Sequence, residues 1–365
     1  MRKLALLIGA VGLTVGMASV SCWASSPFGN YAYVDPESGT DSANCGGTSL
    51  ANPSVGPCQT LNQALNNLVI VGNEGANIFI LKGGLFGPIY INGKLNIFGP
   101  EDRSAEITWI ASTLPGCISA PAGSCNGSAP ATYAVDIEAG ANKPVQLKNI
   151  IIHNGQGTNG ALHVGSAAAL ALQKVTINGG EGTIPEVMLV APSQGSEFEL
   201  YMSQVEVGLS SSGGGLSIAP SGATPVTVSI NNSEIGYALF GVQVNATSLT
   251  TGSNIAMTID NTQFFAFTNS AVSITAPSDG STASIALARS NIINTNGAAL
   301  KINGSGASAS LYETLVTHNN AGVNLVNGGT GSSYQNNQIS NNGTNCEVSG
   351  ASMPCSTALT SQSQD

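Results

Sequence analysis

Short apolar segments recur along most of the chain at nearly constant spacing. Each is six residues long, and its first and last positions are apolar or aromatic in every copy. The eight copies are "LKNIII" (147–152), "LQKVTI" (172–177), "MSQVEV" (202–207), "INNSEI" (230–235), "IDNTQF" (259–264), "LARSNI" (287–292), "LYETLV" (311–316) and "YQNNQI" (334–339). Successive copies begin 25, 30, 28, 29, 28, 24 and 23 residues apart. Self-similarity at such a period indicates a repeat architecture.

A second apolar pattern follows each of the first seven segments. Its apolar and variable residues alternate, which is the period of a β-strand with one buried side. Two columns of apolar residues are therefore expected to face inward. They are Leu162, Met188, Leu216, Val242, Val272, Leu300 and Val323, and Val164, Val190, Ile218, Val244, Ile274, Ile302 and Leu325.

Three architectures are built from many short strands: the sandwich, the propeller and the solenoid. The repeat is too short for a four-stranded propeller blade. An antiparallel sandwich does not require one inward column to recur in a single direction. A coiled parallel stack does, because each coil repeats the last at a rise of about 4.8 Å. The sequence thus predicts an all-β protein, a right-handed parallel β-helix over residues 76–345.

The open ends of such a solenoid need caps. Residues 60–68 have apolar positions at the spacing of an amphipathic helix, and Thr60 with Gln63 forms a capping box. We expect this helix to cover the first coil within an N-terminal cap spanning residues 25–75. At the other end, Cys346 falls in the Val323 column, and residues 346–365 are predicted to form a C-terminal cap and flexible tail.

The N-terminus has the pattern of a secretory signal peptide. Arg2 and Lys3 precede an apolar run over residues 4–20, and small residues follow. Residues 1–24 are assigned to the signal, and export to the periplasm, cell surface or medium is expected. Lipidation of Cys22 is left open. No other long apolar stretch follows, so no membrane insertion is expected.

Six further cysteines form three local pairs, which are 13, 8 and 9 residues apart. Six cysteines allow fifteen pairings, but an oxidising destination favours local disulfides. The expected pairs are Cys45–Cys58, Cys117–Cys125 and Cys346–Cys355. Zinc is disfavoured because no C-x-x-C motif or neighbouring histidine accompanies them.

Charge narrows the possible partners. Charged residues make up 8% of the chain, and the formal net charge is −10. This argues against nucleic acid or an anionic membrane as partner. A polysaccharide partner is compatible with it, whereas the oligomeric state stays open.

Several stretches resemble a known group. "YVDPESGTDSANCGG" and "PCQTLNQAL" are similar to the opening of secreted bacterial parallel β-helix proteins, and "IFILKGGLFGPIYINGKLNIFG" (78–99) to their first coils. "SYQNNQISNNGTN" (333–345) resembles the closing coil of uncharacterised exported members. The resemblance implies a pectate-lyase-like fold. It leaves activity open, because this fold carries lyases, hydrolases, esterases, adhesins and proteins without known activity.

The outward positions of the second strand are where a catalytic site of this fold is expected. They read His163, Leu189, Ser217, Gln243, Ser273, Lys301 and Asn324. No carboxylate is among them, so we expect this face to lack the carboxylate pair that glycoside hydrolysis requires.

Candidate catalytic residues occur in the first strand instead. Asp260, Arg289 and Glu313 fall on three consecutive coils, as an arginine base beside carboxylates would in a calcium-dependent lyase. The competing interpretation is a surface ion pair worth about 0–1 kcal/mol.

Candidate ligand sites are sparse. The turn that contains Asp35, Glu37 and Asp41 offers hard oxygen ligands for calcium, and no other cofactor is expected. Three aromatic residues, Tyr237, Phe267 and Tyr312, are candidates for stacking on sugar rings, against the simpler interpretation that they pack into the fold.

These observations favour an exported, non-catalytic β-helix protein with a surface or matrix role such as polysaccharide contact. The first alternative is a carbohydrate-active enzyme, a calcium-dependent polysaccharide lyase rather than a glycoside hydrolase. The second is a structural or adhesive protein that binds no glycan. Whether the chain is an enzyme stays open.

Overall fold

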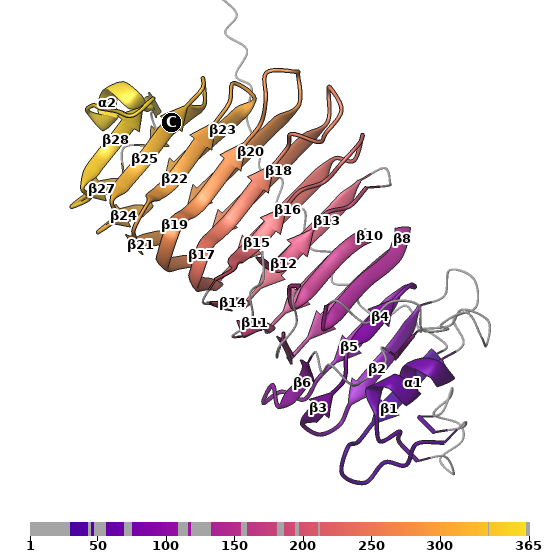
Figure 1. Ribbon diagram of the computed structural model, residues 1–365. Coiled ribbons are helices and arrows are strands. Elements are labelled where there is room, and N and C mark those ends of the chain that lie inside the picture. The colour runs from indigo at the N-terminus through magenta and orange to yellow at the C-terminus, as the bar shows by residue number, and fades with distance from the viewer. Residues whose placement is uncertain are drawn as a thin grey trace, which may run out of the picture.

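The chain coils into a long stack of parallel strands (Figure 1). The computed structural model describes residues 30–42, 45–46, 56–68, 75–108, 116–117, 133–154, 159–180, 186–193, 197–210, 212–334 and 336–362. The predicted signal peptide and the pair Cys117–Cys125 lie outside the described residues, the latter through Cys125. The strand pairings form three faces, here called face 1, face 2 and face 3.

Among the described residues, face 1 contains the most strands. It is built from β1 (Asn30–Val34), β2 (Ala76–Ile80), β5 (Leu95–Phe98), the second halves of β8 (Val135–Lys148) and β10 (Leu162–Gln173), β13 (Phe198–Ser203), β16 (Val226–Asn231), β18 (Asn254–Asp260), β20 (Thr282–Ala288), β23 (Ala307–Tyr312), β26 (Thr330–Tyr334) and β30 (Thr360–Gln362).

Face 2 follows face 1 in each coil. It is built from β3 (Gly84–Phe86), β6 (Ala105–Thr108), β9 (Ile150–His153), β11 (Thr176–Gly180), β14 (Glu206–Ser210), the first halves of β17 (Glu234–Asn245) and β19 (Gln263–Thr275), β21 (Asn291–Thr295), β24 (Leu315–Thr317) and β27 (Gln338–Ser340).

Face 3 completes the coil. It contains β4 (Ile89–Ile91), β7 (Gly116–Cys117), the first halves of β8 and β10, β12 (Glu186–Val190), β15 (Gly214–Ile218), the second halves of β17 and β19, β22 (Ala298–Asn303), β25 (Ala321–Val326) and β28 (Thr344–Val348). The short β29 (Ala351–Ser352) pairs antiparallel with β28.

The predicted columns are confirmed by the register. Leu162 pairs with Met188, and the column continues without a slip to Val323, which pairs with Cys346. These side chains form one continuous hydrophobic core. The fold is therefore the expected all-β parallel β-helix.

One expected column position is wrong. Leu311 pairs with Ser333, whereas Tyr334 pairs with Gln362. Tyr334 does not continue the inward column, because its ring packs edge-on against Tyr312, with centroids 5.8 Å apart. The sequence pattern therefore assigned Tyr334 to the apolar column, although the neighbouring Ser333 occupies that position.

The six-residue segment is two short strands joined at a corner. At its third position the backbone is left-handed in seven successive coils, with φ between 46° and 56°. These corner residues are Asn149, Lys174, Gln204, Asn232, Asn261, Arg289 and Glu313. Asparagine tolerates this conformation better than most residues, which explains part of the pattern. Arg289 and Glu313 are thus both corner residues, placed between face 1 and face 2 of their coils.

Both ends contain the expected local features. Helix α1 (Leu61–Asn67) begins at Thr60, whose side chain accepts a hydrogen bond from the Gln63 amide at 3.1 Å, and its apolar residues join the core. The disulfides Cys45–Cys58 and Cys346–Cys355 are formed, the latter beside the short helix α2 (Cys355–Ala358). That α1 acts as a lid on the first coil stays a prediction. Among the described residues, the helices are too short and too polar to cross a membrane.

Candidate functional site

A cluster of ionisable side chains lies on the outer side of face 3, over β8, β10 and β12. Inward packing of Val135 and Ile137 turns Asp136 outward by the alternation of a strand. His163 is outward for the same reason and pairs with Asp136 across adjacent coils. We call the five residues Tyr133, Asp136, Glu138, His163 and Glu186 the His163 cluster.

Its central contact joins an imidazole to a carboxylate. His163 Nδ1 lies 2.7 Å from Asp136 Oδ1, with 19% and 28% of the two side chains exposed. A carboxylate only accepts hydrogen bonds, so Nδ1 carries the hydrogen and donates it. The ring of Tyr133 stacks on that of His163, with centroids 4.8 Å and planes 17° apart. The imidazole is therefore fixed by a hydrogen bond at its edge and by ring stacking on its face.

Glu138 is positioned from the same two strands. Ser166 Oγ donates a hydrogen bond of 2.8 Å to Glu138 Oε2. A Cβ at position 165 would overlap Glu138 Oε1, so Gly165 provides the space that this carboxylate occupies.

Burial and mutual charge perturb the cluster. Burial raises the pKa of Glu186, and the charge of His163 partly opposes that rise. Burial also raises the pKa of Tyr133, and the charges of Glu186 and Asp136 add to it. The pKa of Tyr90, on β4, is raised by burial and then by Glu138 and Asp136. The acidic groups of β8 and β12 thus raise the pKa values of the neighbouring tyrosines.

The cluster also contains a potential set of metal ligands. One ligand atom each of Asp136, Glu138 and His163 lies within 4.8 Å of the others. Carboxylate and imidazole ligands suit a divalent transition metal better than calcium, which prefers oxygen. A second grouping, of Asp41 with Cys45 and Cys58, offers no thiolate because the two cysteines are bonded to each other.

The expectation that this face carries no carboxylates was wrong. The row of outward residues named above begins at His163, whereas Asp136 and Glu138 lie on the preceding coil. That coil does have a signal, because apolar and acidic residues alternate in "VDIE" (135–138). Residues 109–132 separate it from β6, and this long interval hides the repeat.

The lyase candidates are brought together, but as an ion pair. Arg289 Nη2 lies 2.5 Å from Asp260 Oδ2, and Glu313 occupies the next corner. The hydrogen bond and charge of Asp260 raise the pKa of Arg289 further, with a smaller contribution from Glu313. An arginine must lose a proton to act as a base, and this environment opposes that loss. The arrangement therefore favours the surface ion pair.

The expected calcium ligands each have a protein partner. Asp35 Oδ1 accepts hydrogen bonds from the amides of Glu37 and Ser38, and Asp35 Oδ2 accepts one from Ser38 Oγ. Asp41 Oδ1 accepts from the amides of Gln59 and Thr60, next to the start of α1. Glu37 pairs with Lys82 at 2.6 Å. These contacts tie the N-terminal turn together and leave calcium binding there without structural support.

The three aromatic candidates for ligand binding differ in their exposure and in their ring contacts. Phe267 is 1% exposed and packs in the core near Phe264, so its assignment to ligand binding is wrong. Tyr237 is 58% exposed and meets Phe265 edge-on at 5.0 Å. Tyr312 is partly exposed and packs against Tyr334.

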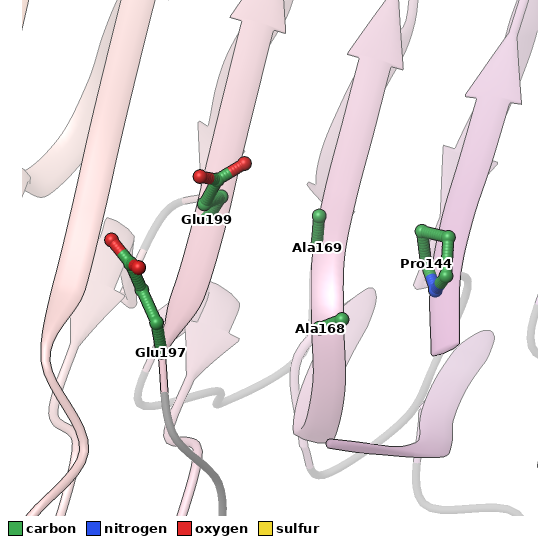
Figure 2. Close-up of a pocket in the computed structure, with 5 residues that line it drawn as sticks. All are labelled: Pro144, Ala168, Ala169, Glu197 and Glu199. Carbon is green, nitrogen blue, oxygen red and sulfur yellow. The ribbon is translucent and has the colours of Figure 1, made fainter. Parts of the chain in front are cut away.

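A shallow hollow of about 290 Å³ lies where β8 and β10 pass onto face 1. It is lined by Pro144, Ala168, Ala169, Glu197 and Glu199. Figure 2 shows the two glutamates along one wall, with Pro144 on the opposite side. Tyr201 Oη donates to Glu199 Oε2 at 2.8 Å, and burial, with this bond, raises the pKa of Tyr201 to about 12. The hollow shares strands β8 and β10 with the His163 cluster.

Comparison with known proteins found few matches. No protein-family model and no curated protein sequence matches the chain. Among solved structures, pectate lyase Pel9A is 12% identical, with a TM-score of 0.42 over 92% of this chain and 78% of that one. Endopolygalacturonase I from Stereum purpureum, complexed with two galacturonates, is 13% identical, with a TM-score of 0.25 over 80% of this chain and 93% of that one. At these values neither match carries an argument about activity.

Proposed function

We propose that this protein is exported and binds an uncharged polysaccharide at the His163 cluster. The observation that carries the proposal is the stacked Tyr133–His163 pair with Asp136 at its edge. Sugar rings offer an apolar face that packs on aromatic rings and hydroxyls that donate to carboxylates. The cluster presents both kinds of partner on the outer side of face 3.

The charge of the cluster narrows the class of sugar. Asp136, Glu138 and Glu186 surround one histidine, so the local potential is negative. A uronate polymer would bring one like charge for each sugar unit. A neutral polysaccharide avoids that repulsion.

Export is supported by the two disulfides at opposite ends of the β-helix, because such bonds persist in oxidising compartments. It agrees with the signal peptide that the sequence predicts.

Affinity electrophoresis tests the proposal directly. We expect mixed-linkage β-glucan, xylan or mannan to retard the protein, and polygalacturonate to have no effect with or without calcium. His163→Ala removes the retardation. Gln243→Ala is the matched control, because Gln243 is exposed in the same outward row three coils away. Absence of retardation by every neutral polymer overturns the proposal and favours the structural or adhesive alternative.

The lyase alternative has its own readout. Release of unsaturated products from polygalacturonate with calcium, lost in Arg289→Ala, would establish it in place of binding by the His163 cluster.

A further inference from the structure

We infer that Asp136, Glu138 and His163 together bind a divalent transition-metal ion, with zinc as the expected species. The inference goes beyond the proposed function and does not depend on it, because the ion is measured in the absence of any sugar. It rests on the spacing of the three ligand atoms, on the space that the backbone provides for Glu138, and on the contacts that orient the imidazole.

The spacing of the three side chains fits a single ion. One ligand atom of each lies within 4.8 Å of the other two. At bond lengths of about 2.0–2.2 Å, two ligands of one zinc ion are about 3–3.5 Å apart. His163 Nδ1 and Asp136 Oδ1 are 2.7 Å apart, so they are already close to the separation of two neighbouring ligands. Rotation about the side-chain torsions of Glu138 brings its oxygen to the same ion.

The backbone places the third ligand. Asp136 and Glu138 alternate with inward residues on β8, so both carboxylates point to the outer side. On β10, His163 pairs with Asp136 and Ser166 pairs with Glu138. Gly165 lies between them, and a Cβ at this position would overlap Glu138 Oε1. Because that Cβ is missing, the carboxylate can lie against the strand that carries the imidazole.

Neighbouring contacts orient the ligands. Ser166 Oγ donates to Glu138 Oε2, which assigns Oε1 to the ion. Tyr133 stacks on the imidazole, with ring centroids 4.8 Å apart, and so fixes the plane in which the two ring nitrogens lie. The neutral ring carries one hydrogen, and its transfer from Nδ1 to Nε2 through solvent frees Nδ1 for the ion without any change in the number of protons. Such outer contacts raise the affinity of a metal site.

Charge and coordination preference select the class of ion. Asp136, Glu138 and Glu186 surround one imidazole, so a bound cation offsets the repulsion between their carboxylates. Calcium prefers six to eight oxygen ligands, whereas zinc accepts imidazole together with carboxylate. Three protein ligands leave a position for water, which reaches the site because 19% of the His163 and 28% of the Asp136 side chain are exposed.

A second histidine provides an internal comparison. His153 Nδ1 lies 3.1 Å from Glu106 Oε1 on face 2, and both side chains are partly exposed. This contact resembles that of His163 with Asp136. Within the described part of the chain, however, no third carboxylate or thiol joins the pair to complete a set of ligands. We therefore expect His153 and Glu106 to bind metal much more weakly than the three proposed ligands.

Isothermal titration calorimetry tests the inference on the tag-free protein, which is first stripped of metal with a chelator and then titrated with zinc chloride. We expect one zinc ion to bind per chain. His163→Ala and Glu138→Gln are each expected to weaken binding by at least about 10- to 100-fold, the range for loss of an outer partner of a ligand. His153→Ala is the matched control, and we expect it to leave the dissociation constant unchanged.

NMR supplies a second readout on the wild-type protein. The chain contains three histidines, and zinc is expected to shift the imidazole signals of His163 before those of His153 and His318. The inference is overturned if zinc does not bind at one ion per chain, or if the signals of another histidine shift first. It is also overturned if His153→Ala weakens zinc binding as much as His163→Ala does.

Discussion

His163 and Asp136 are 27 residues apart in the chain, and a hydrogen bond of 2.7 Å joins their side chains. The bond forms because the two residues occupy the same position of adjacent coils. The bond fixes the imidazole against the ring of Tyr133, and it also orients the carboxylate of Asp136. This pair is the centre around which the other acidic groups are arranged.

Replacement of His163 is expected to weaken polysaccharide binding. His163→Ala removes the stacking partner of Tyr133 and the donor to Asp136. A ring contact contributes about 0.5–1.5 kcal/mol, so we expect affinity to fall roughly 2- to 12-fold. Isothermal titration calorimetry with a bound oligosaccharide measures this. An unchanged dissociation constant would place the ligand elsewhere.

Gly165→Ala tests the position of Glu138 without removing it. The added methyl group would occupy the place of Glu138 Oε1, so the carboxylate must swing away from Ser166. We expect affinity to fall by about fivefold, equivalent to roughly 1 kcal/mol for the lost hydrogen bond. Gly56→Ala is the control, because a Cβ there meets nothing within 4 Å. Equal effects of the two substitutions would contradict the role of Gly165.

Glu186 is expected to make stability depend on pH. Its folded-state pKa is raised above the ordinary glutamate value of 4.5, so above that pH the unfolded chain releases the proton first. The folded state holds more protons in this interval, and the free energy of unfolding therefore falls as pH rises through the raised pKa. His163 and Tyr133 are the groups that face it.

Urea denaturation of the wild type and of Glu186→Gln between pH 4 and pH 8 measures this effect. The glutamine variant cannot ionise, so its stability relative to the wild type should increase over this range. A constant difference at all pH values would show that Glu186 titrates normally.

The ion pair between Arg289 and Asp260 is expected to contribute little. Arg289 is about half exposed, with 53% of its side chain accessible. A double-mutant cycle of Arg289→Ala and Asp260→Ala should give a coupling energy of less than about 1 kcal/mol. Polysaccharide binding should be unaffected. A coupling of several kcal/mol, or loss of binding, would return these residues to the list of functional candidates.

The disulfide Cys346–Cys355 is expected to stabilise only the C-terminal coil. Its loop is short, with a sequence separation of 9, for which chain entropy gives roughly 2–3 kcal/mol. Because each coil contacts only its neighbours, replacing both cysteines with alanine should loosen β28 but not β16. Hydrogen exchange measures both strands in one experiment. Equal loss of protection throughout would show that the stack unfolds as a single unit.

Much of the fold was predictable from local periodicity. The inward column from Leu162 to Val323 could be read from the sequence because each position repeats the same requirement for an apolar side chain. The Tyr334 position could not, since hydrophobicity alone does not distinguish an inward residue from one that packs on an outer neighbour.

The residues of the candidate site could not be predicted as well from the periodicity of the sequence. Arg289, Asp260 and Glu313 attracted attention because they lie in the regular repeats, yet there they form a corner ion pair. Asp136 and Glu138 lie on the coil that follows residues 109–132, where the period is lost. Phe267 shows the opposite case, since an aromatic residue near a corner turned out to be core.

The sequence by itself determined the parallel β-helix and most of its inward columns and favoured local pairing of its terminal cysteines, because those features depend on periodic or local patterns. The tertiary structure alone decided which outward side chains meet. Contact between His163 and Asp136 depends on the register of two adjacent coils, and apolar periodicity does not show which outward side chains come close enough to form a hydrogen bond. The burial that raises the pKa of Glu186 likewise exists only once neighbouring coils enclose it.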